Sequence, residues 1–352
     1  MAVLAVMSPA GLVDRLTAWD GMWYLRIAAG GYDLGAFLDA QDHPNPYTPR
    51  AFFPGYPVLI DWLSRTTGAG PVAAALIVSA VAGLFAAYGL ARLGRIVRGG
   101  SARAGYLLVA LFASAPMGIV LSMAYTEALF CALAVWALIG VLERRWELAG
   151  VCCALAGLVR SSALALALAV MLAALVSVRT DRWRAAPALV LAPTGLVAYL
   201  WWTGLRVRPE AGFTDQLRTW SDLEWQGWAT KFDGGAATWR FLGQALTSDA
   251  GMSLLTVAVL GGSVALFGIS SWRRLEWPLL VYGALVLVMC LGTSSLMHAK
   301  PRLLLPAFTL LIPVAIGLSN RRTSTAVLTV AGAAILSAWF GGYALDVWKY
   351  AI

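Results

Sequence analysis

The sequence predicts an all-α polytopic membrane protein, and three observations support that prediction. The 352-residue chain is 60% hydrophobic and only 12% charged, whereas soluble domains carry about 25% charged residues. Its mean hydropathy is +0.74. Apolar runs of about 20 residues recur along the chain, which is the length that a helix needs to cross a hydrocarbon core.

Eight of these apolar runs are predicted to be single spans: 70–91, 104–124, 127–142, 186–204, 251–270, 277–297, 302–319 and 324–342. The run 148–178 is too long for one crossing, and Arg160 lies in its interior beside two serines. Serine side chains can bond the backbone groups that a helix break frees. We therefore expect two short helices that meet near Arg160. The run at residues 1–13 is short for a span and lacks the basic start of a cleavable signal peptide.

Five short connections carry arginine: 91–103, 143–147, 179–184, 272–276 and 320–322. Because cytoplasmic loops are enriched in Lys and Arg, we place all five inside the cell. This enrichment explains the net charge of +8 without any nucleic-acid partner. The other connections must then face outward: 14–69, the turn at Tyr125-Thr126, the break at Arg160, 205–250, 297–302 and the C-terminus.

The two long outer segments differ in composition from the arginine-bearing connections. Segment 14–69 has a proline-rich middle, in which His43 is expected at the surface, and six aspartates: Asp14, Asp20, Asp33, Asp39, Asp42 and Asp61. Segment 205–250 holds four tryptophans, Trp220, Trp225, Trp228 and Trp239, a residue type that favours the membrane–water interface. The chemically unusual residues therefore collect on one face.

Asp20 begins a helix-length run that we expect to lie along the interface, with Trp23, Ile27 and the Gly30-Gly31 pair on one face and Met22 and Arg26 on another. Asp20 could be the N-cap of this helix, accepting backbone amide hydrogen bonds. It could also be a general base, whose proton affinity tryptophan and lipid would raise. One carboxylate can do both.

Two further charges lie at outer helix ends. Glu127, in "AYTEALF", either belongs to a helix start that Thr126 caps or shapes a polar pocket on the same side as Asp20. Arg160 is costly at membrane depth unless it is paired or wetted. A salt bridge to Glu127 or Asp20 would pair it, whereas an anion site would use the bidentate match between arginine and phosphate.

The segment "MHAKPRLLLPAF" supplies His298, Lys300 and Arg302 at another outer helix entrance. Snorkelling would account for the two cations, but such cations are commoner at the cytoplasmic edge. Because Pro301 breaks the helix, we expect the three side chains to point toward a common anion.

Nucleotide and metal motifs are missing from the sequence, which contains no P-loop, no G-x-G-x-x-G turn and no zinc spacing. The four cysteines, Cys131, Cys152, Cys153 and Cys290, fall inside apolar runs and are expected to face lipid or core. Reactions at an outer face have no supply of nucleotide sugars, so a donor there would have to arrive on a lipid.

Five motifs in this order resemble the mannosyltransferase II family of glycosylphosphatidylinositol assembly (the PIG-V family), within the C-type glycosyltransferase superfamily. They are "WDGMWYLRIAAGGYD", "AFFPGYP", "AYTEALF", "LVRSS" and "HAKPRLLLPAF", spread over residues 19–308. The resemblance implies a single membrane-embedded catalytic domain, here residues 1–352, with about 10–11 transmembrane helices and interfacial helices in the first outer loop. One departure is Ala163, where the family has a glycine three positions after the arginine.

The resemblance implies an inverting transfer of mannose from a polyprenyl-phosphate donor, without cofactor or metal, at the outer face of what would be a bacterial plasma membrane. The acceptor hydroxyl would belong to a glycolipid, a lipoglycan or a protein. Asp20 maps onto the family's catalytic acid. The resemblance also carries over an outer acid onto Glu127, an in-membrane arginine onto Arg160, and a His-x-x-x-Arg element onto His298 and Arg302. With these four residues, we expect Trp19, Tyr125 and Lys300 to bind substrate.

Chemistry assigns the roles of these residues. Asp20 would remove the acceptor proton, and Arg160, with Lys300 or Arg302, would stabilise the departing phosphate. The main rival is a transporter or flippase of a lipid-linked sugar, but the two halves show no matching broken segments. A non-catalytic scaffold would leave the cost of Arg160 unexplained. The residues do not distinguish mannose from another polyprenyl-phosphate sugar.

Overall fold

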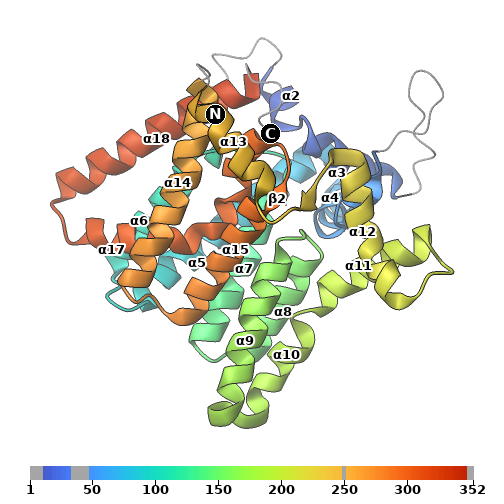
Figure 1. The fold of residues 1–352 in the computed structure, drawn as a ribbon, viewed down its shortest axis with the longest axis horizontal. Coiled ribbons are helices and arrows are strands. Elements are labelled where there is room, and N and C mark those ends of the chain that lie inside the picture. The colour runs from blue at the N-terminus through green and yellow to red at the C-terminus, as the bar shows by residue number, and fades with distance from the viewer. Residues whose placement is uncertain (1–10, 33–46, 248–250, 347–352) are drawn as a thin grey trace.

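The computed structural model describes residues 11–32, 47–247 and 251–346, and within these ranges it confirms an all-α protein (Figure 1). Its described strands are one antiparallel pair of two residues each, β1 (Lys231–Phe232) with β2 (Thr293–Ser294). His43 and residues 1–10 lie outside the described residues. The described cysteines are free thiols, and three of the four are buried.

The helices follow one another with few long connections. The first outer segment contains α2 (Leu12–Leu16), α3 (Asp20–Gly30), the 3-10 helix η1 (Pro49–Ala51) and α4 (Gly55–Thr67). The middle of the chain forms α5 (Pro71–Ile96), α6 (Ala102–Ala113), η2 (Gly118–Ser122), α7 (Glu127–Leu142), α8 (Trp146–Gly157), α9 (Ala163–Asp181), η3 (Arg182–Ala185), α10 (Ala186–Leu191) and α11 (Thr194–Val207). The rest contains α12 (Phe213–Trp228), α13 (Ala236–Leu246), α14 (Gly251–Trp272), α15 (Trp277–Gly292), η4 (Met297–Ala299), α16 (Lys300–Leu303), η5 (Leu305–Leu311), α17 (Ile312–Ser319) and α18 (Thr323–Asp346).

The core of the bundle is built around α7, which contacts α5, α8 and α9. Nearly all of its side chains are buried, as expected of a helix that is apolar on every side. Small residues let the neighbouring backbones approach closely. A Cβ on Gly140 would lie 2.8 Å from the Ala149 nitrogen, and one on Gly105 would lie 2.2 Å from the Ala91 carbonyl oxygen. Such contacts are typical of helix packing in membranes.

Four helices are long and apolar enough to cross a membrane, and a fifth candidate is the bent pair that meets at Leu304; these counts cover the described residues. Five further apolar helices are shorter, at 102–113, 127–142, 146–157, 163–178 and 277–292. A helix of 12 residues is about 18 Å long and does not by itself span a core of about 30 Å.

Two predicted spans are corrected. The run 104–124 is not one helix, because α6 ends at Ala113 and a 3-10 segment, η2, follows the break at Pro116. The run 302–319 is bent by 60° between residues 303 and 305. The predicted division of 148–178 is confirmed: α8 ends at Gly157 and α9 begins at Ala163, on either side of Arg160. Ala163 at the missing glycine's position is simply the first residue of α9.

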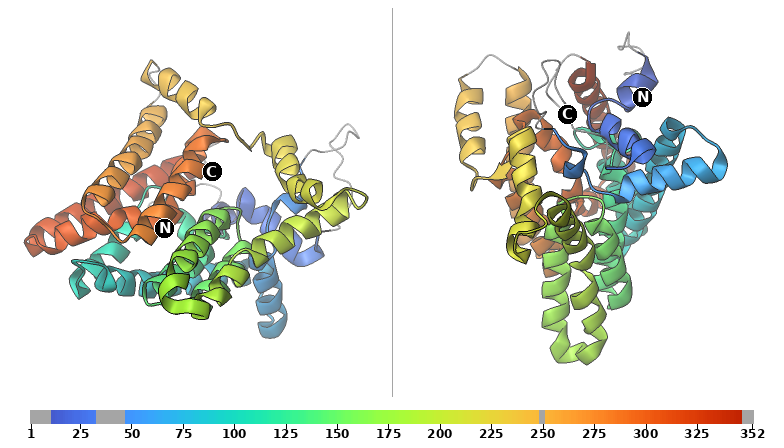
Figure 2. Two further views of the ribbon diagram at one scale, coloured as in Figure 1. Left: turned by 60° about the horizontal axis from the view of Figure 1, so that its bottom comes forward. Right: turned by 90° about the vertical axis from the view of Figure 1, so that its right-hand side faces the viewer.

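Four of the five arginine-bearing connections contact one another directly. Arg92 pairs with Glu143 at 2.7 Å. The Arg98 amide donates to the Glu276 carboxylate at 2.6 Å, and the Arg103 guanidinium donates to the Arg321 carbonyl at 2.9 Å. These bonds join connection 91–103 to 143–147, 272–276 and 320–322. The fifth connection, 179–184, joins α9 to α10. These two helices extend away from α3 and α13 (Figures 1 and 2).

Candidate active site

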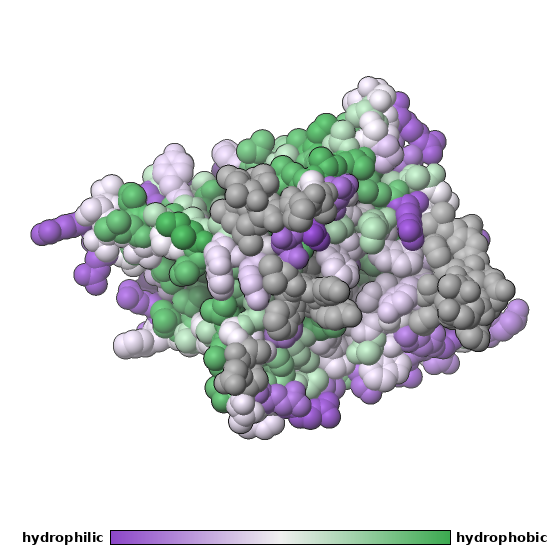
Figure 3. Space-filling view, turned by 90° about the horizontal axis from the view of Figure 1, so that it is seen from above, coloured by the Kyte–Doolittle hydropathy of each residue, from purple (hydrophilic) through white to green (hydrophobic). Residues whose placement is uncertain are grey.

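A cavity lies at the helix ends opposite the arginine-bearing connections. Helices α7 and α15, of 16 residues each, have one end at connections 143–147 and 272–276 and the other at Glu127 and Thr293. A helix of that length spans about 24 Å. The cavity occupies about 750 Å³, and its lining comes from α3, the Arg160 break, α12, α15 and α16. Viewed from above, hydrophilic residues lie mainly along the edges of this face, with hydrophobic residues between them (Figure 3).

Asp20 reaches the cavity from the first turn of α3. It is not the N-cap, because Trp19 holds that position and no side chain caps the helix. The interpretation of Asp20 as a capping residue is therefore wrong. Trp19 has φ 57° and ψ −118°, a conformation that strains any residue other than glycine. Both residues line the cavity.

The helix predicted after Asp20 is present, but its buried face differs from the expected one. Gly21, Tyr24, Ile27 and Ala28 are buried, whereas Gly30 is exposed and Trp23 is half-buried. Met22 and Arg26 are exposed, as expected. Gly21 lies against the Ala124 carbonyl, where a Cβ would be 3.3 Å from the oxygen. Close packing at this point keeps Asp20 beside the start of α7.

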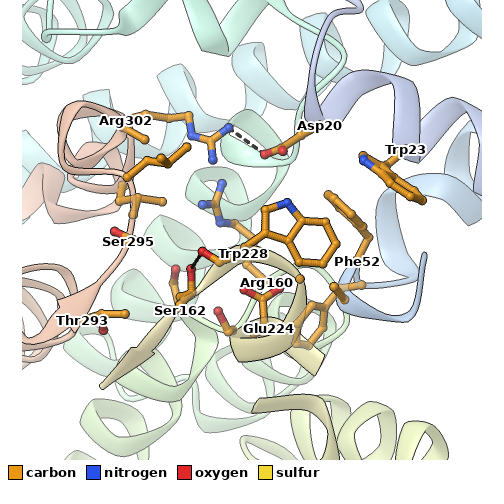
Figure 4. A pocket seen from close by; sticks show the side chains of 18 of the residues that line it. Asp20, Trp23, Phe52, Arg160, Ser162, Glu224, Trp228, Thr293, Ser295 and Arg302 are labelled. Atoms are coloured by element: carbon orange, nitrogen blue, oxygen red, sulfur yellow. Dashed lines mark hydrogen bonds and ion pairs between the residues drawn. The ribbon is translucent and has the colours of Figure 1, made fainter. Parts of the chain in front are cut away.

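Four charged residues form a ladder of alternating sign: Asp20, Arg302, Glu127 and Arg160. The Arg302 Nη1 donates to the Asp20 Oδ2 at 2.7 Å, a pair shown at the top of Figure 4. The Arg302 Nε lies 3.6 Å from the Glu127 Oε1, and Arg160 forms an ion pair with the same oxygen. The expected salt bridge between Arg160 and Glu127 is thus present, and the two acids balance the two arginines.

Buried neighbours hold the ladder in place. The Arg160 Nη1 donates to the Thr126 hydroxyl at 3.2 Å, and Tyr24 shares that hydroxyl at 3.4 Å. Thr126 therefore orients the arginine and does not cap α7 with its side chain. The Tyr125 ring lies under the Arg302 guanidinium, 5.2 Å from its centroid, in a cation–π contact. Glu127 itself is 1% exposed and lies beneath the cavity, not in its lining.

The motif "AFFPGYP" fixes the Arg160 break. The Gly55 amide donates to the Leu158 carbonyl at 2.7 Å, and a Cβ at this glycine would lie 2.9 Å from that oxygen. Tyr56 is fully buried and donates to the Ala75 carbonyl at 2.9 Å. The first outer segment therefore packs directly on the helix end that precedes Arg160.

The predicted convergence of His298, Lys300 and Arg302 is wrong for two of the three. Lys300 is fully buried, and its Nζ donates to the Thr238 hydroxyl and to the backbone carbonyls of Cys290 and Thr293, at 2.6, 2.8 and 2.9 Å. The imidazole of His298 shares a hydrogen bond with the Thr256 hydroxyl at 3.1 Å. Only Arg302 lines the cavity. Residues 300 and 302 lie about 200° apart around a helix, so one turn aims them in opposite directions.

Sequence reasoning missed one wall of the cavity. Glu224 on α12 lines it together with Trp23, Phe52 and Trp228. In Figure 4, Glu224 lies below the Asp20–Arg302 pair with Trp228 between them, and Trp23 and Phe52 lie to the right, with Trp23 close to Asp20. Burial, with a smaller effect of Asp20, raises the pKa of Glu224 to about 8. The sequence signal for this wall is an acidic residue beside tryptophans in "SDLEWQGW" (221–228). By themselves, those tryptophans indicate only residues of the membrane–water interface.

This arrangement supplies an anion site beside a carboxylate. Arg160 and Arg302 present guanidiniums suited to a phosphate, and Asp20 keeps one oxygen, Oδ1, that accepts no hydrogen bond from the described residues. The rim and far wall are aromatic, as in sites that hold amphipathic ligands. Within the described ranges, no three His, Cys, Asp or Glu side chains are grouped to hold a metal ion.

Comparisons with known proteins show the fold. No family model matches the chain, and no curated protein matches it. Among solved structures, ArnT from Cupriavidus metallidurans bound to undecaprenyl phosphate is similar, with a TM-score of 0.58 and 18% identity. The match covers 96% of this chain but 61% of ArnT, so the chain spans less than two thirds of that protein's length. The chain has the C-type membrane glycosyltransferase fold.

Proposed function

We propose that the protein transfers a sugar, expected to be mannose, from a polyprenyl-phosphate donor to an acceptor hydroxyl, with inversion at the anomeric carbon. The observation that carries the proposal is that Asp20, Arg160 and Arg302 line one cavity although they are far apart in sequence. The ArnT structure, which holds undecaprenyl phosphate, supports a lipid phosphate as the anion. The acceptor would be a glycolipid, a lipoglycan or a protein.

The chemistry follows from the charges in the cavity. The acceptor oxygen forms a bond to the anomeric carbon while its proton passes to the Asp20 carboxylate. The bond between that carbon and the phosphate oxygen breaks, and the phosphate leaves with the electron pair. Arg160 and Arg302 stabilise the charge that develops on it. When a phosphate replaces Asp20 as the partner of Arg302, the carboxylate is freed to act as base.

The reaction would take place at the outer face of a plasma membrane. The arginine-bearing connections lie at the far helix ends, about 24 Å from the cavity, and the positive-inside rule assigns them to the cytoplasm. Labelling of single cysteines introduced at residues 22 and 144, in otherwise cysteine-free protein, tests this orientation. Position 22 should react with an impermeant reagent in intact cells, and position 144 only after lysis. The reverse pattern would refute an outer active site.

An assay with radiolabelled polyprenyl-phosphate mannose in membranes tests the activity. We expect radiolabel in a new product, whereas a flippase would move the donor unchanged. Asp20→Asn should lower the transfer rate about 10²–10⁴-fold, as loss of a positioned base does, and should leave the protein folded. Asp222→Asn, an exposed acid on α12, is the matched control. Wild-type transfer by Asp20→Asn would show that the base is another group.

A further inference from the structure

Glu224 is an acid in the cavity to which the proposed reaction gives no role. Its side chain lines the cavity from α12, and among the described residues no hydrogen bond or ion pair engages its carboxyl group. The two arginines of the ladder are already paired with Asp20 and Glu127. Glu224 is half-buried, so its carboxyl group can bond water in the empty cavity. A ligand that displaces this water must supply the hydrogen bonds instead.

The surroundings of Glu224 are aromatic. Trp23 and Phe52 stack with ring centroids 5.5 Å apart and an interplanar angle of 16°. Trp228 meets both rings edge-on, at 5.5 Å from Phe52 and 6.2 Å from Trp23. We call these three residues the aromatic wall. Mutual packing fixes their orientation, so the wall and Glu224 present a preformed surface.

We propose that Glu224 and the aromatic wall form a subsite for the sugar ring of the lipid-linked donor, separate from the arginines that take its phosphate. The inference rests on the proposed function and deepens it. A donor sugar is joined to its phosphate through a single oxygen. With the phosphate held by Arg160 and Arg302, the sugar must occupy the adjoining space, which Glu224 and the aromatic wall bound (Figure 4).

The chemistry of this wall suits a sugar. A sugar ring combines apolar C–H faces, which pack on aromatic rings, with hydroxyl groups that need hydrogen-bond partners. A protonated carboxyl group can donate one hydrogen bond and accept others, and the pKa of Glu224, raised to about 8, keeps it protonated at neutral pH. A neutral group here also avoids repelling the lipid phosphate and Asp20.

The test compares two lipids, polyprenyl phosphate and polyprenyl-phosphate mannose, whose Kd ratio isolates the contribution of the sugar. Binding is measured on the purified full-length protein in nanodiscs. Glu224→Ala should raise the Kd of the glycosylated lipid about 3- to 10-fold, the value of one net hydrogen bond, and leave that of polyprenyl phosphate unchanged. Glu224→Gln, which keeps a donor and an acceptor, should retain wild-type affinity for both.

Two matched variants control for the location. Asp222→Asn removes an acid from the same helix, where Asp222 pairs with Arg208 at the surface, and should change neither Kd. Trp228→Ala should raise the Kd of the glycosylated lipid and leave that of polyprenyl phosphate unchanged. Trp225→Ala should change neither Kd, because the Trp225 ring packs on Lys231 outside the cavity.

Each remaining outcome counts against one identified claim. If Glu224→Ala raised the Kd of both lipids equally, the proposal of a sugar subsite would be overturned, because the residue would then act on phosphate binding or on folding. An unchanged Kd ratio combined with slower transfer would also overturn it, since Glu224 would then serve the acceptor. If the wild-type protein bound neither lipid, the proposed function itself would fail. Binding of polyprenyl phosphate without sugar discrimination would refute the subsite alone.

Discussion

Neutralising Glu127 should destabilise the protein more than any other single change of charge that we consider. Its side chain is 1% exposed between Arg160 and Arg302, which are 13% and 11% exposed. Glu127→Gln keeps the shape but leaves two buried guanidiniums with Asp20 as their remaining carboxylate. Breaking a buried ion pair typically costs about 3–5 kcal/mol. With 352 residues and about 2.1 cal/mol/K of unfolding entropy per residue, that cost lowers Tm by about 4–7 °C.

The assay follows the folded fraction of detergent-solubilised protein by size-exclusion chromatography after heating. Glu143→Gln is the matched control, because the Arg92–Glu143 pair is 39% and 22% exposed and such pairs contribute about 1 kcal/mol or less. The double variant Glu127→Gln/Arg160→Gln should recover part of the loss, with a coupling free energy of about 1 kcal/mol or more. Equal Tm losses for Glu127→Gln and Glu143→Gln, or strict additivity in the double variant, would refute the ladder as a coupled unit.

Three further predictions concern the supports of the cavity. Gly55→Ala should lower both Tm and transfer rate, because its Cβ would lie 2.9 Å from the Leu158 carbonyl oxygen, whereas Gly83→Ala, with open space around it, should do neither. Lys300→Met should cost about 1–3 kcal/mol of stability by orphaning buried carbonyls, yet leave the Kd of polyprenyl phosphate unchanged; a large rise in that Kd would restore Lys300 as a phosphate ligand. Because the pKa of Glu224 is about 8, binding of polyprenyl-phosphate mannose by the wild type should weaken between about pH 7 and about pH 9, as the carboxyl group loses the proton that it donates to the sugar. Glu224→Gln should abolish that sugar-specific pH dependence, and its persistence would assign it to another group.

Much of the helical framework could be predicted from local sequence. The predicted range 127–142 is the range of α7. The prediction succeeds because the apolar run has a charged residue at each end, Glu127 at its start and the arginines after residue 142, and these charges fix where the helix begins and ends. The break at Arg160 followed from the cost of a charge inside a long apolar run together with the alternating sides of the connections. Both arguments use one segment at a time.

The predictions that failed depended on tertiary contacts or on weak local signals. The run 104–124 contains Pro116, and its break lets the Ala124 amide donate to the Leu16 carbonyl at 2.8 Å, a bond between distant segments. Hydropathy averaged over a span does not register that proline. Lys300 and Arg302 lie in the same helical turn but point in opposite directions. The sequence "HAKPR" does not show which of the two side chains faces the cavity.

Glu224 illustrates a different gap. Position along the chain placed it in an outer loop, but its role depends on α12 folding over the cavity opposite Asp20, which no local pattern encodes. Tryptophans nearby had an adequate explanation as interface anchors. Only the structure separates Trp228, which lines the cavity, from Trp225, which does not.

The cavity and its charges have a common cause in helix endings. Asp20 and Glu127 are the first residues of α3 and α7, Arg160 lies between α8 and α9, and Arg302 lies in the one-turn helix α16 before a 60° bend. Within a membrane, a helix that stops leaves backbone groups that must find polar partners or water. Each ending therefore makes a locally polar site in which a charged side chain costs less than it would in mid-span. Four endings that meet at one depth can support four charges, so the breaks that exclude continuous spans are what allow an ionic site there.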